Sequence, residues 1–170
     1  MSAKIELSYH PFNDNKYTTL FSPYCLKVFK QRWYVLGFSS RHQQIRTFSF
    51  DRIEDIALTE EAFSIPKDFN QHSYFNNCYG ITYSPHLELE IIVFKVNSRQ
   101  IPYFRTRPIP HSQTEIKEGI FQIKAYLSYE LIQELLSYGS NIEVFSPTSV
   151  RIKIKEEAMK MIEMYQTKLP

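Results

Sequence analysis

The sequence contains little glycine and little cysteine. Of its 170 residues only 4 are glycine and 2 are cysteine, whereas 12 are tyrosine and 13 are phenylalanine. So few glycines exclude a glycine-rich loop that binds phosphate through backbone amides, and they exclude a disordered low-complexity chain. Cys25 and Cys78 have no motif spacing, so we expect two free thiols in a reducing compartment rather than a disulfide.

Metal-binding and catalytic patterns are also missing. The histidines are far apart in the sequence, with no pair at i, i+4: His10, His42, His72, His86 and His111. Because the two cysteines are distant as well, no zinc spacing occurs, and we expect no metal and no cofactor. Glu88 and Glu90 share one face of a predicted strand and are candidate paired carboxylates, but the alternation of a half-exposed strand explains them at least as well. We therefore expect no enzyme.

No segment is typical of export or membrane insertion. The N-terminus lacks a basic stretch followed by an apolar run, and no apolar run approaches the roughly 20 residues that cross a bilayer. We therefore expect a cytoplasmic protein with no membrane partner. Since Met1-Ser2-Ala3 leads almost directly into a predicted strand, we keep open that a further domain precedes this chain in a longer protein.

Acidic residues are absent from one long interval, between Asp14 and Asp51. The same interval contains six basic residues: Lys16, Lys27, Lys30, Arg32, Arg41 and Arg46. The formal net charge of the whole chain is only +2, which hides this local excess. A local field of one sign attracts ions of the other sign, so the interval is a candidate anion-binding surface. The alternative is a chance run of basic residues on solvated strand faces.

Short extended segments dominate the first part of the chain. We predict strands at residues 4–9, 18–29, 32–39, 45–50 and 52–59, separated by turns. Residues 32–39 are apolar on both faces, which favours a closed or covered sheet. Five short strands with tight connections indicate a small β-barrel. With a short helical tail, this barrel is expected to form a domain over residues 1–80.

Residues 81–170 are expected to form a second domain. We predict strands at 87–96, 113–117, 120–127 and 141–147, and helices after residue 97, at 128–139 and at 149–166. Ser128 is the predicted N-cap of the middle helix, and Gly139 ends it. The order strand, short helix, strand, strand, helix, strand, helix resembles a ferredoxin-like α/β sandwich. The fold class of the whole chain is therefore mixed β and α+β.

Strand alternation relates the aromatic and basic residues at 46–52. Arg46, Phe48, Phe50 and Arg52 share one face if the strand stays regular. Two guanidiniums beside two aromatic rings can clamp a phosphate while a ring stacks on a base. In the alternative, the phenylalanines fill the core and the arginines reach solvent or pair with carboxylates such as Asp51.

Trp33 and Tyr34 are neighbours and point to opposite faces of a predicted strand. A buried tyrosine needs a partner for its hydroxyl, whereas tryptophan provides mainly apolar area. We therefore expect Trp33 to anchor the core and Tyr34 to contact a ligand.

Several motifs together resemble the WYL domain of bacterial transcriptional regulators. They are Pro23-Tyr24, Arg32-Trp33-Tyr34-Val35-Leu36-Gly37, Arg46-Thr47-Phe48 and Asp51-Arg52-Ile53, preceded by Ile5 to Tyr9 and His10-Pro11-Phe12. Residues from about 87 to 166 are similar in layout to the C-terminal extension that often follows this domain. The resemblance implies an Sm-like, SH3-type barrel that binds a nucleic acid fragment or nucleotide. It also implies a preceding helix-turn-helix domain whose promoter binding responds to that ligand.

By position, the resemblance implies ligand contacts at Tyr9, Tyr34, Arg46 and Arg52, and charge and strand parity add Lys27. The chain departs from the family pattern in three ways. Ser22 stands where a histidine is common, Val35 stands at the third motif position with Leu36 one step later, and no helix-turn-helix domain is present in this sequence.

Two hypotheses follow for the function. In the first, the chain is a ligand-sensing module whose C-terminal unit transmits the signal through formation of a homodimer or adds to the ligand-binding surface. In the second, it is a protein-interaction or dimerisation module in which the arginines are structural and no ligand binds.

Overall fold

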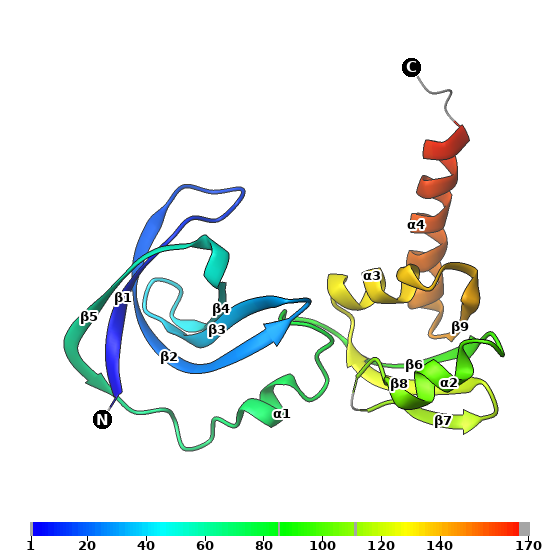
Figure 1. Cartoon of the computed structure of the whole chain (residues 1–170), viewed down its shortest axis with the longest axis horizontal. Coiled ribbons are helices and arrows are strands. Elements are labelled where there is room, and N and C mark those ends of the chain that lie inside the picture. Colours follow the sequence, from blue (N-terminus) through cyan, green and yellow to red (C-terminus); the bar gives the residue numbers. More distant parts are fainter. Residues whose placement is uncertain (1, 85, 111, 167–170) are drawn as a thin grey trace. The chain divides into compact units, whose positions relative to one another are not determined.

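Two antiparallel sheets with helices make up the chain in the computed structural model, which describes residues 2–84, 86–110 and 112–166 (Figure 1). The chain divides into two compact units, residues 1–71 and residues 72–170, and each has its own apolar core. The fold class is therefore mixed α+β. The predicted domain boundary between residues 80 and 81 stays a prediction.

Unit 1 is a single five-stranded sheet. Its strands are β1 (Ser2–Tyr9), β2 (Tyr17–Phe29), β3 (Arg32–Ser39), β4 (Gln44–Ser49) and β5 (Ile53–Phe63), in the order β4-β3-β2-β1-β5. The 3-10 turn η1 (Phe50–Arg52) connects β4 to β5. Lys30 and Gln31 form the two-residue turn between β2 and β3, and both have positive φ, as such a hairpin turn requires. All five predicted strands are thus present.

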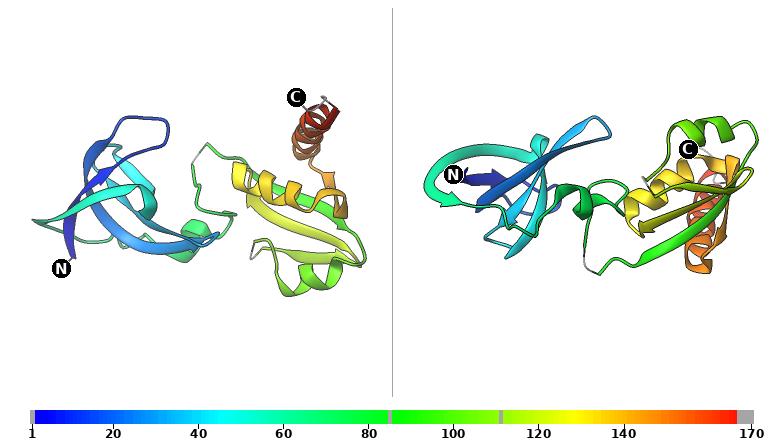
Figure 2. Two further views of the ribbon diagram at one scale, coloured as in Figure 1. Left: turned by 45° about the horizontal axis from the view of Figure 1, so that its top comes forward. Right: turned by 90° about the horizontal axis from the view of Figure 1, so that it is seen from below.

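The predicted closure into a barrel is not confirmed. Among the strands described for residues 2–84, β4 and β5 are the two edges of the sheet and do not pair with each other. The sheet is strongly curved, as both views in Figure 2 show. Its core consists of side chains that alternate onto one face: Leu7, Tyr9, Phe21, Val35 and Phe48.

Gly37 permits a close approach of two strands. A Cβ added at this position would lie 2.1 Å from the carbonyl oxygen of Ser22 and 2.6 Å from a ring carbon of Phe21. Both distances are far below van der Waals contact, so only glycine fits. Because Gly37 pairs with Arg46 on β4, this close contact also helps to set where Arg46 lies.

Unit 2 contains a four-stranded sheet in the order β7-β8-β6-β9. Its elements are α1 (Gln71–Phe75), β6 (Leu89–Val96), α2 (Ile101–Thr106), β7 (Thr114–Lys117), β8 (Ile120–Tyr126), α3 (Tyr129–Ser137), the 3-10 turn η2 (Gly139–Asn141), β9 (Ile142–Ser146) and α4 (Thr148–Gln166). From β6 onward the order of strands and α-helices confirms the prediction. The hydroxyl of Ser128 accepts a hydrogen bond from the amide of Leu131 at 3.2 Å, as expected for an N-cap.

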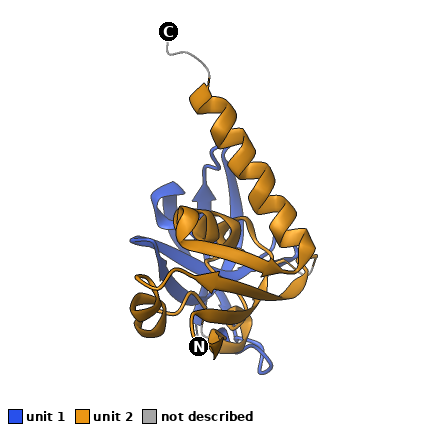
Figure 3. Ribbon diagram, turned by 90° about the vertical axis from the view of Figure 1, so that its right-hand side faces the viewer, with its two compact units in different colours: residues 1–71 blue, residues 72–170 orange. Residues whose placement is uncertain are grey.

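The two long helices of unit 2 differ in burial. Leu131, Ile132 and Leu135 of α3 pack into the core with side chains of the sheet. In α4 only Val150 is fully buried, and the helix extends away from the rest of its unit (Figure 3). None of the helices in the described residues has the length and apolarity needed to span a bilayer.

Candidate anion-binding site

Tyr9 and Arg52 form the centre of a basic site in unit 1. Tyr9 is 5% exposed, and its hydroxyl accepts a hydrogen bond from the amide of Ser49 at 3.4 Å. The guanidinium of Arg52 lies over the Tyr9 ring, 5.2 Å from its centroid, and 4.8 Å from the centroid of the Phe12 ring. The Arg52 Nε atom is buried and has no hydrogen-bond partner among the described residues. An unpaired buried donor costs free energy, so a movement of the Arg52 side chain that exposes this atom to an acceptor would be favoured.

A second arginine–tyrosine pair adjoins the first. Tyr17 pairs with Tyr9 across β1 and β2, and the two ring centroids are 6.0 Å apart. Arg41, in the turn between β3 and β4, lies over the Tyr17 ring at 4.6 Å. Burial raises the pKa of Tyr17, while the positive charges of Arg41, Arg46 and Arg52 oppose that rise. Arg41 therefore contacts the Tyr17 ring directly, and Arg46 and Arg52 act on the Tyr17 phenol through their charges.

His42 comes from the same turn as Arg41. Its Nδ1 lies 2.9 Å from the hydroxyl of Ser39, which lies 3.0 Å from the hydroxyl of Thr19. Its ring meets the edge of Tyr17 at 5.6 Å. Burial lowers the pKa of His42, and the charges of the two nearby arginines lower it further. The imidazole is therefore mainly neutral at pH 7.

These side chains are called the arginine–tyrosine cluster below: Tyr9, Tyr17, Arg41, His42, Arg46 and Arg52. Within residues 2–84, no ion pair joins any of its arginines to a carboxylate. Nearby acids have other partners. Asp51 pairs with Arg32 at 3.2 Å and accepts a hydrogen bond from Ser49, while Glu54 pairs with His10 and Lys16. The arginines of the cluster are therefore opposed only at longer range, as by Asp51, whose pKa the charge of Arg52 helps to lower.

A pocket of about 270 Å³ gives access to Arg52. Its walls are His10, Pro11, Phe12, Asp51, Arg52 and Glu54. The described residues contain no group of three or more His, Cys, Asp or Glu side chains that could hold a metal ion. The pocket places Arg52 beside the carboxylates of Asp51 and Glu54, whereas Arg41 and Arg46 of the cluster are exposed basic side chains that can attract an anion.

The structure separates the five predicted ligand contacts into two groups. Tyr9, Arg46 and Arg52 belong to the cluster. Lys27 and Tyr34 pair with each other across β2 and β3, and strand alternation places both on the opposite face from Arg46. Tyr34 is 8% exposed and Lys27 is partly exposed. A ligand role for any of the five stays a prediction.

Two expectations about aromatic residues are wrong. Trp33 does not anchor the core, because it is 53% exposed and pairs with Val28, which is also 53% exposed. Both residues lie near the tip of the β2–β3 hairpin, which extends beyond the core. Phe50 does not share the buried face of Phe48, because β4 ends at Ser49 and Phe50 begins η1, where it is 43% exposed.

Three members of the cluster were missed by the sequence argument. Arg41 lies in the acid-free interval, so its charge was noted, but strand alternation cannot place a turn residue. His42 is in the same turn. Tyr17 stands opposite Tyr9 only because of the β1–β2 register, and that register was the signal that could have found it.

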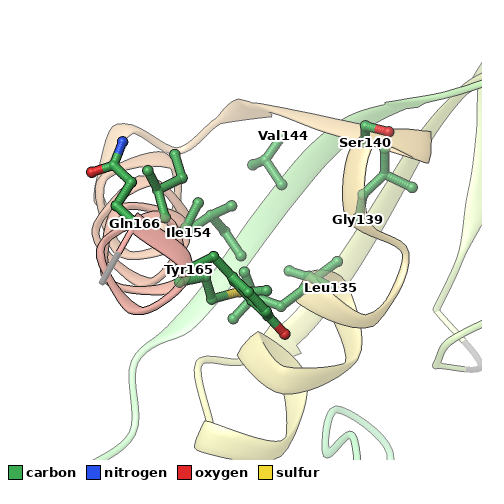
Figure 4. Close-up of a pocket in the computed structure, with 12 residues that line it drawn as sticks. Leu135, Gly139, Ser140, Val144, Ile154, Tyr165 and Gln166 are labelled. Carbon is green, nitrogen blue, oxygen red and sulfur yellow. The ribbon is translucent and has the colours of Figure 1, made fainter. Parts of the chain in front are cut away.

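Unit 2 contains an apolar groove of about 530 Å³ between α4 and the α3–β9 region. In Figure 4, Ile154 and Tyr165 of α4 lie across the groove from Leu135 of α3. Ala158, Met161 and Ile162 line it from the same helix. Met161, Ile162 and Tyr165 are 51%, 56% and 87% exposed. Exposed apolar area of this kind is typical of an interaction surface.

Sequence comparison identifies both units. Residues 2–58 match the WYL domain model, and residues 88–162 match the WCX domain model. The chain is 26% identical over 147 residues to the uncharacterized HTH-type transcriptional regulator YobV of Bacillus subtilis (strain 168). That alignment covers 85% of this chain and 46% of the relative.

Solved structures are also similar. A crystal structure of a CRISPR Cas-related protein matches with a TM-score of 0.60 at 9% identity, over 96% of this chain and 48% of that chain, which shows a shared fold alone. Proteasome accessory factor B/C (PafBC) of Arthrobacter aurescens matches with a TM-score of 0.41 at 19% identity, over 99% and 26% of the two chains. The chain spans less than half the length of each of these three proteins. It is a WYL domain protein, in which a WYL domain is followed by a WCX domain.

Proposed function

We propose that this chain is the ligand-sensing part of a bacterial transcriptional regulator, and that its ligand is a nucleic acid fragment or a nucleotide. The arginine–tyrosine cluster is the observation behind this proposal, because its three guanidiniums have no carboxylate partner among the described residues. The relative YobV is described as an HTH-type regulator of which this chain spans 46%. Ligand binding here would then control a helix-turn-helix domain elsewhere in the longer protein.

The chemistry of the cluster suits phosphate. Guanidinium groups bind phosphate oxygens with paired, charge-assisted hydrogen bonds. Arg41 and Arg52 are each held over a tyrosine ring, so they lose little further conformational entropy when a ligand binds. Lys27 and Tyr34 lie on the other face of the sheet and would contact a ligand only if it extends around an edge. We propose no catalytic activity for this chain. We also propose that the protein is located in the cytoplasm.

The finer fold assignments are also proposals. An Sm-like, SH3-type fold for unit 1 is supported by the strand order β4-β3-β2-β1-β5 and by the 3-10 turn between the two edge strands. A ferredoxin-like fold for unit 2 is supported by the strand order β9-β6-β8-β7, with α2 and α3 as the connecting helices.

Calorimetric titration with short single-stranded DNA and RNA tests the function. Fluorescence of Trp33 is a poor readout, because this residue is at the exposed end of a hairpin. We expect Arg46→Ala and Arg52→Ala each to weaken binding about tenfold or more, and Arg99→Ala, at an exposed arginine of unit 2, to leave it unchanged. Binding that survives both cluster substitutions would reject this site.

The apolar groove favours a second candidate function, a homodimerisation or protein-interaction module. Sedimentation at several concentrations tests it, with Ile162→Glu in the groove and Met164→Glu as the control. Met164 is on the same helix and 74% exposed but does not line the groove. We expect a dimer that Ile162→Glu dissociates and Met164→Glu preserves. A monomer at every concentration would reject the dimer.

A further inference from the structure

The tyrosine rings of the cluster are poor stacking surfaces for a base. Arg41 covers Tyr17 at 4.6 Å, and Arg52 covers Tyr9 at 5.2 Å. The Tyr9 ring also packs against Phe48, with 4.7 Å between centroids, and is 5% exposed. Stacking requires an open ring face. The two tyrosines therefore hold guanidiniums in place, and the cluster offers charge rather than aromatic surface.

The charge of the cluster exceeds that of an internal phosphodiester. Arg41, Arg46 and Arg52 contribute three positive charges around Tyr17. The negative charge of Asp14 raises the pKa of Tyr17, but Asp14 makes no ion pair with these arginines within residues 2–84. A phosphodiester has one negative charge, whereas a terminal phosphate monoester has about 1.5 to 2 at pH 7. Electrostatic attraction consequently favours the monoester.

The hydrogen-bond donors lead to the same ligand. Each guanidinium has five N–H donors and no acceptor, and none of the three arginines donates to a carboxylate within residues 2–84. A phosphate monoester presents three terminal oxygens, one more than a diester presents. The three arginines come from β4, from η1 and from the β3–β4 turn, so together they offer more donors than the two terminal oxygens of a diester can accept.

We infer that the arginine–tyrosine cluster selects a terminal phosphate monoester over an internal phosphodiester, so that the ligand is recognised by its phosphorylated end. This inference rests on the proposed function. It narrows the ligand class to phosphorylated ends of short nucleic acid strands and to nucleotides that have a terminal phosphate.

Calorimetry with matched probes tests this selectivity. The probes are a short thymidine oligonucleotide with a 5′-hydroxyl, the same strand with a 5′-phosphate or with a 3′-phosphate, and inorganic phosphate. We expect one phosphorylated end to bind about tenfold tighter than the hydroxyl strand, and inorganic phosphate to compete with it. Equal affinity for all three strands would overturn the inference and leave the proposed function standing. Failure of every probe to bind would overturn both.

Two variants assign the effect to the cluster. Arg41→Ala changes an exposed turn residue, so folding is expected to be retained, and circular dichroism checks this. It should remove most of the advantage of the phosphorylated strand while binding of the hydroxyl strand changes less. Arg46→Lys keeps the charge and removes the fork geometry, so we expect part of the advantage to remain. An undiminished advantage in both variants would place the phosphate elsewhere and reject the inference.

Discussion

Arg52 lies over the ring of Tyr9, 5.2 Å from its centroid, although the two residues are 43 positions apart in the sequence. The backbone holds the pair together. Tyr9 pairs with Ile53 at the end of the β1–β5 ladder, and the amide of His10 donates a hydrogen bond to the carbonyl oxygen of Arg52 at 3.0 Å. The guanidinium is thus positioned by a sheet edge and a ring, without a carboxylate.

Tyr9→Phe separates the ring from the hydroxyl. This change removes the acceptor for the Ser49 amide, so we expect the free energy of unfolding to fall by about 1 kcal/mol. Ligand affinity should change less than about twofold, because the ring under Arg52 remains. Tyr9→Ala should reduce stability by about 3 kcal/mol and weaken binding. Urea denaturation and calorimetry measure both quantities, and loss of binding in Tyr9→Phe would show that the hydroxyl contacts the ligand.

Gly37→Ala should destabilise unit 1 by about 2 kcal/mol or more, because the new methyl group would meet the backbone of β2 at 2.1 Å. Gly139→Ala is the matched control. Its φ is +55° and nothing lies within 4 Å of an added Cβ, so only the backbone conformation costs energy, about 1 kcal/mol. Denaturation curves of the two variants provide the test. A smaller loss at Gly37 than at Gly139 would contradict the strand packing described here.

The stability of unit 1 should depend on His42 below neutral pH. Because the folded pKa of His42 is lower than its ordinary value of 6.5, the unfolded chain binds a proton more readily. The free energy of unfolding therefore decreases as pH falls below about 6.5, and this contribution stops changing below the folded pKa. His42→Gln should show a weaker decrease between pH 7.5 and pH 5 in chemical denaturation. Identical pH profiles for the two proteins would refute this.

Salt should report how many phosphates the cluster neutralises. For single strands the slope of log affinity against log salt is about 0.7 per neutralised phosphate. We expect Arg41→Ala to lower the slope, since Arg41 makes no ion pair within residues 2–84 and its charge is exposed to the ligand. Titrations at several salt concentrations measure it. A slope that does not change would place Arg41 outside the phosphate site.

Local sequence patterns were sufficient to predict the order of elements. A run that is apolar on both faces indicated β3, an apolar-rich run indicated β6, and Ser128 with Gly139 bracketed α3 as expected. Trp33 shows the limit of such patterns, because its burial depends on how far a hairpin extends past the core. Local patterns also could not predict whether the barrel closes. Closure depends on whether β4 reaches β5, and local alternation contains no information about that distance.

The candidate site was predictable in part. Arg46 and Arg52 were grouped by assuming a regular strand, yet the strand ends at Ser49 and η1 turns the chain. The positive charges of both arginines nevertheless oppose the rise in the pKa of Tyr17, because the β1–β5 pairing returns Arg52 to the same side of the sheet. Arg41 reaches Tyr17 from a turn. Contacts made by turns and by strand register require the three-dimensional structure.

Most of the charge of the cluster comes from segments that contribute nothing to the core of unit 1, and Arg46 of β4 is the exception. Arg41 and His42 are in the β3–β4 turn and Arg52 is in η1, whereas the core cluster comes from the strands. Mutations in the turn can therefore alter the charge of the site without removing a core side chain. Exchange of the β3–β4 turn alone would therefore change the charge of the cluster while Leu7, Tyr9, Phe21, Val35 and Phe48 stay in the core.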